Sequence, residues 1–335
     1  MTDMITFLQK KLSEAENSGQ LQGQLKLNES LARYTTWRIG GNAECLYQPK
    51  DKSDLQTVLQ LLPENTSVNW IGLGSNLLVR DAGVKGLTIY TNGVLNKLDI
   101  ECCDEDEQVE DQAVCMMTAQ AGVACAIFSR KAANSGLNGA EFLSGIPGTI
   151  GGALAMNAGA FGGETWRHVV NVTMINDQGI LITRTPDEFN IQYRKIEAKK
   201  TLNGSENKIQ RQEWFLSAVF KFKKDEKGLE KSKLEIKRLL IKRAETQPTK
   251  QANAGSVFKN PKNDYAARLI ESCGLKGKAI NDAQISEKHA NFIINKGAAK
   301  AKDVEALIEE IKTAVLMKYQ IELETEVRII GEYTC

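Results

Sequence analysis

Residues 144–164 read SGIPGTIGGALAMNAGAFGGE, in which seven of 21 residues are glycine although the segment is apolar and almost uncharged. A flexible linker would place Ser, Gln or charged residues between its glycines, whereas this one carries Ile146, Ile150, Leu154 and Phe161. Glycine leaves the backbone N–H groups open to a ligand because it has no Cβ. The segment therefore predicts a partly buried loop and short helix that bind a large, flat, anionic cofactor.

The composition is that of an ordinary globular chain. Its 335 residues include 43 basic and 42 acidic ones, so no whole-chain charge attracts nucleic acid or an anionic membrane, and small-molecule partners are expected. Seven cysteines without a CxxC spacing speak against a metal site or a disulfide framework, and they favour a reducing cytoplasm. No run reaches the ~18 apolar residues of a membrane span, and the amino terminus lacks an export signal.

The pattern of apolar residues predicts an α+β fold in three parts. Residues 1–29 are expected to be a helical extension, because Ile5, Leu8 and Leu12 recur at helical spacing. Residues 30–224 alternate between strand and helix patterns and form two α+β subdomains. Residues 225–335 form a small C-terminal domain of helices on a sheet. Its expected elements are helices at 228–244, 264–273 and 303–319 and strands at 289–295 and 322–330.

Two polar segments interrupt this pattern. Residues 101–111 carry seven acids in eleven positions, which is typical of an exposed hairpin loop. Residues 195–212 are rich in lysine and polar side chains, so a surface excursion is expected there.

A second glycine turn, GLGSN at 72–76, follows a strand pattern. It is not a Rossmann fingerprint, because Leu77 stands where the third glycine belongs, and the chain has no GxxxxGK[ST] loop. The turns at 72–76 and 144–163 are expected to clamp one pyrophosphate through their N–H groups. The alternative is that both are only tight turns between strands.

Histidine networks cannot carry the proton chemistry, since His168 and His289 are the only histidines. Carboxylates, hydroxyls and arginines remain. Ser256 lies in AGSVFKNP, where Gly255 permits an unusual backbone angle and Lys259 and Asn260 supply donors. On its own, Ser256 is equally consistent with an ordinary serine at a strand edge.

Seven segments between residues 30 and 331 closely resemble the UDP-N-acetylenolpyruvoylglucosamine reductase family. They are TTWRIGGNAE (35–44), GLGSNLLVRD (72–81), GAEFLSGIPGTIGGALAMNAGAFGGE (139–164), YR (193–194), AGSVFKNP (254–261), HANFIIN (289–295) and ETEVRIIG (324–331). The resemblance implies a vanillyl-alcohol-oxidase-type FAD-binding domain with a small C-terminal substrate-binding domain. It also implies a cytoplasmic oxidoreductase of peptidoglycan synthesis with non-covalent FAD.

According to this resemblance, NADPH reduces the flavin and leaves. The enolpyruvyl ether of UDP-N-acetylglucosamine then takes hydride from flavin N5 in the same pocket and becomes UDP-N-acetylmuramate. The cofactor-binding residues implied are Ile39, Gly40, Gly41, Gly72, Leu73, Gly74, Ser75, Asn76, Leu77, Ser144, Gly145, Pro147, Gly148, Gly151, Gly152, Asn157, Ala158 and Gly159.

The catalytic residues that the resemblance implies are Arg194, Ser256 and Glu326. Arg194 and Glu326 would stabilise the enolate-like charge at the substrate carboxylate, and Ser256 would deliver the proton with help from Lys259 or a neighbouring charge. The implied substrate-binding residues are Tyr193, Lys259, Asn260, His289, Arg243 and Gln247.

The chain departs from the family pattern at two places. Ile196 stands where a serine often follows the tyrosine and arginine, and Asn281 and Asp282 stand where a glycine is expected. The 70 residues between Ser256 and Glu326 match the shorter, type II-like variety of the family. Two alternatives remain open at this point: a flavin oxidase with the same cofactor fold, and a catalytically inactive nucleotide-binding or scaffold protein.

Overall fold

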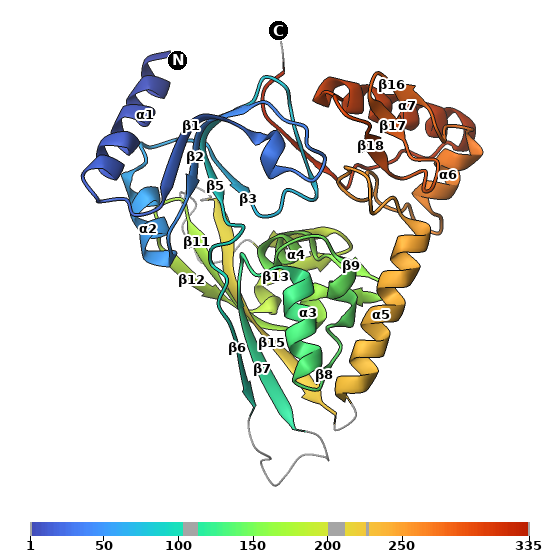
Figure 1. Ribbon diagram of the computed structural model, residues 1–335, viewed down its shortest axis with the longest axis horizontal. Coiled ribbons are helices and arrows are strands. Elements are labelled where there is room, and N and C mark those ends of the chain that lie inside the picture. The colour runs from blue at the N-terminus through green and yellow to red at the C-terminus, as the bar shows by residue number, and fades with distance from the viewer. Residues whose placement is uncertain (1, 103–112, 200–211, 226–227, 334–335) are drawn as a thin grey trace.

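The computed structural model describes residues 2–102, 113–199, 212–225 and 228–333. It is an α+β molecule with an N-terminal part, a central part and a C-terminal part, each visible as a separate colour range in Figure 1. The chain ends in the upper half of that view, near the N-terminal part. The predicted acidic loop at 101–111 and the excursion at 195–212 fall mostly outside the described residues.

The N-terminal part is a four-stranded sheet in the order β1-β2-β5-β3. The strands are β1 (Gln24–Ser30), β2 (Asn42–Gln48), β3 (Val68–Ile71) and β5 (Val84–Tyr90). Strands β2, β5 and β3 are parallel, whereas β1 runs antiparallel to β2. The sequence analysis did not anticipate β1, which lies within the expected helical extension.

Two helices cover this sheet, α1 (Thr2–Asn17) and α2 (Lys52–Leu61). The expected amphipathic helix at the amino terminus is confirmed, because Leu8 and Leu12 are buried against the sheet residues Cys45 and Leu87. Helix α2 begins at the side chain of Asp51, whose carboxylate accepts the N–H of Asp54. Both helices thus bury their apolar faces on one sheet.

The central part is an antiparallel sheet with the strand order β12-β11-β15-β7-β6, and β8 pairs with one end of β15. Its strands are β6 (Leu98–Cys102), β7 (Val114–Gln120), β8 (Leu137–Asn138), β11 (Val169–Asn176), β12 (Leu181–Arg184) and β15 (Glu213–Lys224). Alternation along β15 buries Ala218, Phe220 and Phe222 on one face, where they join the largest central core cluster. The opposite face contributes Ile175 and Leu216 to the core shared with the N-terminal part.

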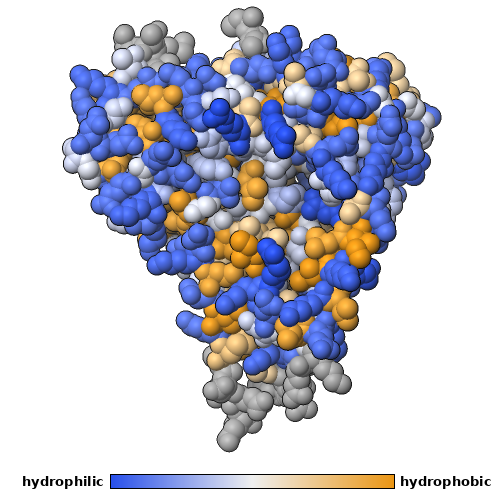
Figure 2. Space-filling view, viewed as in Figure 1, coloured by the Kyte–Doolittle hydropathy of each residue, from blue (hydrophilic) through white to orange (hydrophobic). Residues whose placement is uncertain are grey.

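Three helices lie along the central sheet (Figure 1). They are α3 (Cys125–Asn134), α4 (Ile150–Met156) and α5 (Gly228–Thr246), together with the 3-10 turns η2 (Glu141–Gly145) and η3 (Thr165–His168). The expected short helix in the glycine-rich segment is therefore confirmed as α4. Figure 2 shows apolar residues gathered where α3 and α5 lie, and the exposed apolar side chains of these two helices are Ile127, Leu229, Leu234, Leu240 and Ile241.

The C-terminal part packs α6 (Ala266–Ser272) and α7 (Ala301–Tyr319) against a small antiparallel sheet. The sheet has the order β16-β17-β18, with strands at Ala279–Ile280, Ala283–Ile285 and Ile293–Asn295. The predicted apolar stripe of the last helix is confirmed, since Val304, Leu307 and Ile311 are buried in this core. Asn281 forms the β16–β17 turn with a left-handed φ of 49°, a conformation that asparagine tolerates.

The last predicted strand belongs elsewhere. Only β19 (Arg328–Ile330) forms a ladder, and it pairs in parallel with β4 (Leu77–Val79) of the N-terminal part rather than with the C-terminal sheet. Of the strand expected at 322–330, Arg328–Ile330 therefore form a ladder and Thr325 forms an isolated bridge with Phe258. Since β4 directly follows the turn at 72–76, its pairing with β19 brings Arg328–Ile330 next to that turn.

The C-terminal part is also tied to the loop at residues 36–39. Trp37 and Ile39 are buried in the C-terminal core, and the Trp37 indole N–H donates to the carbonyl of Ile293 at 2.7 Å. The carboxylate of Asp81 accepts the N–H groups of Ala301 and Lys302 at the start of α7. These contacts join the C-terminal part to the loop before β2 and to the residues after β4, the strand that follows the turn at 72–76.

One cysteine expectation was wrong. Cys102 and Cys115 form a disulfide across β6 and β7, where the two residues are directly opposite in the ladder. Sequence spacing could not reveal it, because two antiparallel strands bring residues 13 positions apart into contact. Cys45, Cys125 and Cys273 are free. Within the described ranges, no helix is long and apolar enough to cross a membrane.

Candidate active site

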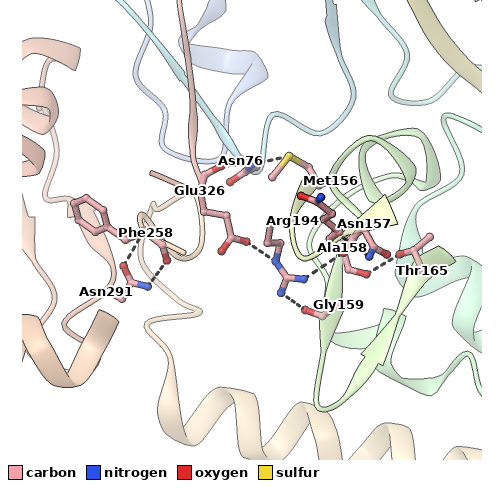
Figure 3. Close-up of polar contacts among 11 residues, drawn as sticks. Asn76, Met156, Asn157, Ala158, Gly159, Thr165, Arg194, Phe258, Asn291 and Glu326 are labelled. Carbon is pink, nitrogen blue, oxygen red and sulfur yellow. Dashed lines mark hydrogen bonds and ion pairs between the residues drawn. The ribbon is translucent and has the colours of Figure 1, made fainter. Parts of the chain in front are cut away.

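An ion pair between Arg194 and Glu326 lies at the meeting point of the three parts (Figure 3). The Arg194 Nε donates to Glu326 Oε1 at 2.9 Å, and the two side chains are only 15% and 16% exposed. The residues are 132 positions apart, so tertiary structure alone brings them together. A charge pair in such a sheltered place interacts more strongly than one in water.

Arg194 lies at the tip of a tight hairpin between β13 (Phe189–Gln192) and β14 (Lys195–Ala198). Its φ is 57°, which is a costly left-handed conformation for a side chain other than glycine or asparagine. The guanidinium also donates to the carbonyls of Asn157 at 3.2 Å and Gly159 at 2.6 Å. The ring of Tyr193 lies 4.8 Å below the guanidinium carbon.

Glu326 is held by backbone contacts on both sides. Its N–H donates to the carbonyl of Val257 at 2.7 Å, and its carbonyl accepts the side-chain amide of Asn76 at 3.1 Å. Burial raises the pKa of the Glu326 carboxyl, and the Arg194 charge opposes that rise. The site therefore keeps a carboxyl group that is easier to protonate than one in water.

Ser256 directly precedes Val257, so the Val257–Glu326 bond brings the segment that carries Ser256 against the main chain of Glu326. Gly255 has a φ of 76°, which confirms the unusual backbone angle expected before the serine. The side chain of Asn291 holds the main chain of Phe258 at both its N–H and its carbonyl, at 2.9 and 2.8 Å. In the described part of the chain, the Ser256 hydroxyl makes no hydrogen bond, which leaves it available to a ligand.

Lys259 and Asn260 have other partners. Lys259 forms an ion pair of 2.7 Å with Glu324, and the Asn260 side chain accepts the N–H of Ala266 at the start of α6. His289 is largely buried, and its Nδ1 accepts the N–H of Asn291 at 3.3 Å. Burial lowers the pKa of His289, so the ring stays neutral. Substrate contacts by these three residues remain predictions.

The two glycine turns lie side by side. A Cβ on Gly72 would be 2.6 Å from Thr149 Oγ1, and one on Gly148 would be 3.4 Å from Ser75 Oγ. Gly74 has a φ of 61° and lies so close to Tyr34 that a Cβ would be 2.0 Å from its carbonyl oxygen. Glycine is therefore required where these turns meet.

The two turns differ in the use of their N–H groups. Within the described residues, none of the five N–H groups at 72–76, which include those of Leu73 and Asn76, has a protein acceptor. By contrast, Ile150 and Gly151 at the start of α4 donate to Val123 and Ala121, and Gly152 donates to Thr149 Oγ1. The turn at 72–76 thus keeps a run of five open donors, whereas the first N–H groups of α4 are used within the protein.

Residues 39–41 lie on the other side of this turn. Ile39 is buried in the C-terminal core, whereas Gly40 has a φ of 153° and packs on Val79. A Cβ on Gly41 would be 2.3 Å from the carbonyl oxygen of Asp81. This loop therefore packs against β4 and the residues that follow it.

Arg243 and Gln247, at the end of α5, lie against the start of the glycine-rich segment. Arg243 donates to the carbonyl of Gly145 and, at 3.0 Å, to the side chain of Gln247. Burial lowers the pKa of Arg243. The predicted cofactor residues Ser144 and Gly145 are buried beside it, and Pro147, two residues after Gly145, is exposed.

Asn157, Ala158 and Gly159 contact protein groups. The carbonyls of Asn157 and Gly159 accept Arg194, and the carbonyl of Ala158 accepts Thr165 Oγ1 at 2.7 Å. Their predicted cofactor role stays a prediction. Sequence reasoning missed the structural roles of Thr149, Met156 and Asn291, although all three lie in segments that the motifs singled out.

These features fit FAD. A run of open N–H groups at 72–76 suits a pyrophosphate, because backbone donors stabilise phosphate charge without a bulky side chain. Glycine at 72 and 74 lets this turn pack closely on Thr149 and Tyr34, which fixes the position of its N–H groups. The residues that would hold FAD are therefore those of the 72–76 turn, which faces Gly148 and Thr149.

Comparison with known proteins agrees with this geometry. Residues 43–184 match the family model described as "FAD binding domain", and residues 247–330 match "UDP-N-acetylenolpyruvoylglucosamine reductase, C-terminal domain". A UDP-N-acetylenolpyruvoylglucosamine reductase of Coxiella burnetii (strain Dugway 5J108-111) is 46% identical over 326 residues, which covers 95% of this chain and 99% of the relative. One from Legionella pneumophila (strain Corby) is 47% identical over 312 residues, covering 93% and 94%.

Solved structures give the same result. The crystal structure of a UDP-N-acetylenolpyruvylglucosamine reductase from Thermus caldophilus has a TM-score of 0.71 and 29% identity, covering 93% of this chain and 100% of that one. The 6-hydroxy-D-nicotine oxidase of Arthrobacter nicotinovorans has a TM-score of 0.51 at 12% identity over 90% and 88%, which shows the fold alone. The chain is therefore an oxidoreductase with an FAD-binding domain, and it belongs to the UDP-N-acetylenolpyruvoylglucosamine reductase family of peptidoglycan synthesis.

Proposed function

We propose that this enzyme uses NADPH to reduce the enolpyruvyl ether of UDP-N-acetylglucosamine to UDP-N-acetylmuramate, with Arg194, Glu326 and Ser256 as its catalytic residues. The proposal is supported by the pairing of Arg194 with Glu326 across 132 residues and by the backbone bond from Glu326 to Val257, the neighbour of Ser256. NADPH and the UDP-sugar are anionic nucleotides that do not cross membranes unaided, so we place the reaction in the cytoplasm. No nucleic-acid partner is proposed.

When bound, non-covalent FAD would supply hydride transfer between NADPH and the methylene carbon of the enolpyruvyl group. The N–H groups of residues 72–76 would hold its pyrophosphate, and the glycine-rich segment from Ser144 to Gly159 would line its other side. Arg243 is held at Gly145, where it adds a positive charge beside this segment.

Arg194 and Glu326 would face the substrate carboxylate. Hydride addition at the methylene carbon moves electron density toward the carbon that bears this carboxylate. A guanidinium fixed by the Asn157 and Gly159 carbonyls stabilises that charge without reorganising during the reaction. Glu326, which pairs with this guanidinium at 2.9 Å, would polarise the enolate-like group that develops at the carboxylate.

Ser256 would give its proton to the carbon that carries the carboxylate. One hydride and one proton then add across the double bond, so the product has one new C–H bond at each carbon. The Lys259 charge lies three residues along the chain but pairs with Glu324 at 2.7 Å. The acidifying influence on Ser256 is therefore assigned to Arg194 and the substrate, not to Lys259.

Anaerobic spectroscopy of the purified enzyme tests this function. The protein should absorb near ~450 nm from bound flavin, lose this absorbance with NADPH and regain it with the enolpyruvyl UDP-sugar. Failure to regain it would reject the substrate. Rapid recovery in air without any UDP-sugar would instead favour a flavin oxidase, and a colourless protein that cannot be reconstituted with FAD would favour a non-catalytic role.

A further inference from the structure

Asn157 is 1% exposed, and its side-chain amide makes three hydrogen bonds to protein groups near the proposed site. Its amide donates to the carbonyl of Gln192 and to Glu164 Oε2, both at 3.3 Å. Its Oδ1 accepts the N–H of Trp166 at 3.2 Å. Every hydrogen-bonding group of this amide thus faces protein.

The Asn157 main chain contacts the catalytic arginine directly. Its carbonyl accepts the Arg194 Nη1 at 3.2 Å. Its φ of 41° is left-handed and forms the C-cap of α4, a position that turns the carbonyl away from the helix axis. One residue therefore contacts the guanidinium through its backbone and the hairpin of Arg194 through its side chain.

Gln192 is the last residue of β13 before the Tyr193–Arg194 turn. The turn needs this support because Arg194 adopts a φ of 57° without being glycine, and a strained conformation persists only where its surroundings over-determine it. The contact from Asn157 to the Gln192 carbonyl fixes the start of the turn, and the contact to Nη1 fixes the end of the side chain.

We propose that Asn157 is a positioning residue for Arg194: it holds both the hairpin and the guanidinium in the geometry that pairs with Glu326. This role rests on the proposed catalytic role of Arg194. Because its side chain is buried, Asn157 acts through Arg194 and not through contact with the substrate. Misplacing a reactive group by about 1 Å can cost ~10²-fold in rate.

Two substitutions separate the contacts. Asn157→Gly keeps the left-handed backbone and the carbonyl but removes the amide. Asn157→Asp keeps an acceptor for the Trp166 N–H but cannot donate to the Gln192 carbonyl. We expect both variants to bind FAD and to be reduced by NADPH at the rate of the native enzyme, while reoxidation by the UDP-sugar slows ~10- to 10²-fold.

Asn281→Gly is the matched control, since Asn281 also has a left-handed φ of 49° and donates to Asp303 at 2.8 Å. Both half-reactions should be unchanged in this variant. Equal slowing of both half-reactions in the Asn157 variants, or loss of FAD, would mean that Asn157 is merely structural. If Asn157→Asp is reoxidised at the native rate and Asn157→Gly is reoxidised slowly, the contact that matters is the one to the Trp166 N–H and not the one to the Gln192 carbonyl. That result would overturn the proposal.

A double-mutant cycle with Arg194→Lys completes the test. If Asn157 acts through Arg194, Asn157→Gly should slow reoxidation less than twofold further in the Arg194→Lys background. Additive losses would contradict the proposal. If Arg194→Lys itself reoxidises at the native rate, the catalytic role of Arg194 fails. If Arg194→Lys is slow and Asn157→Gly is not, only the positioning role fails.

Discussion

The N–H of Glu326 donates a hydrogen bond of 2.7 Å to the carbonyl of Val257. This bond joins the segment before β19 to the segment that carries Ser256. Because Glu326 also pairs with Arg194 at 2.9 Å, the carboxyl, the guanidinium and the main chain next to Ser256 are joined although they come from three distant segments.

The first prediction concerns Ser256. Ser256→Ala should still lose its flavin absorbance with NADPH, because the hydroxyl acts only when the UDP-sugar is protonated. Reoxidation by the UDP-sugar should slow ~10²- to 10⁴-fold, the usual contribution of a positioned acid. Stopped-flow absorbance measures the two half-reactions separately, with Ser53→Ala on the exposed side of α2 as the control. Equal slowing of both half-reactions would contradict the assigned role.

The second prediction concerns the backbone of Arg194. Arg194→Gly and Arg194→Ala both remove the guanidinium, but only glycine adopts the φ of 57° without strain. The glycine variant should therefore be more stable than the alanine variant by about 1–2 kcal/mol in denaturant unfolding, because left-handed backbone costs a non-glycine residue this much. Both should reoxidise slowly with the UDP-sugar. Equal stabilities would show that this turn is relaxed in the native enzyme.

The third prediction concerns the packing of the two glycine turns. In Gly72→Ala the new Cβ would lie 2.6 Å from Thr149 Oγ1, which must push the turns apart. FAD should bind more weakly by about 1–3 kcal/mol, the usual cost of overpacking, in a titration of the apoprotein. Adding Thr149→Ala should recover part of the affinity. Gly297→Ala, whose Cβ would meet only Asp282 at 3.4 Å, is the control.

The fourth prediction concerns Glu326 and pH. Burial raises its pKa above the usual 4.5, so the folded protein binds this proton more tightly than the unfolded chain does. The stability that the neutral carboxyl contributes is complete below pH 4.5 and is lost as the pH rises through the raised pKa. Glu326→Gln does not titrate. Its melting temperature relative to the native enzyme should therefore rise between about pH 4 and pH 8. A constant or falling difference would contradict the raised pKa.

Local sequence patterns predicted the helices well. The stripe of Val304, Leu307 and Ile311 predicted α7, and Leu8 and Leu12 predicted α1, because a helix displays its period within a few residues. Strands were harder. β1 was missed, and of the strand expected at 322–330 only Arg328–Ile330 form a ladder. The reason is that a strand is defined by its partner rather than by its own pattern.

In the candidate site, too, local motifs identified some residues, and tertiary contacts identified the others. The motifs singled out Arg194, Ser256 and Glu326, and their catalytic roles remain proposals. The motifs did not indicate that Asn157 contacts both the hairpin and the guanidinium, since a left-handed asparagine resembles any turn asparagine in sequence. Nor could the spacing of Cys102 and Cys115 reveal their disulfide, which depends on the ladder between β6 and β7.

The sequence by itself determined the fold class, the helices, the requirement for glycine in two turns and the family to which the chain belongs. These properties follow from local chemistry and from the order of motifs along the chain. Tertiary structure alone decided that the 72–76 turn keeps its N–H groups open, that β19 returns to β4, and that Glu326 meets Arg194 across 132 residues. Such contacts depend on how whole elements pack, and no residue carries that information within its own neighbourhood.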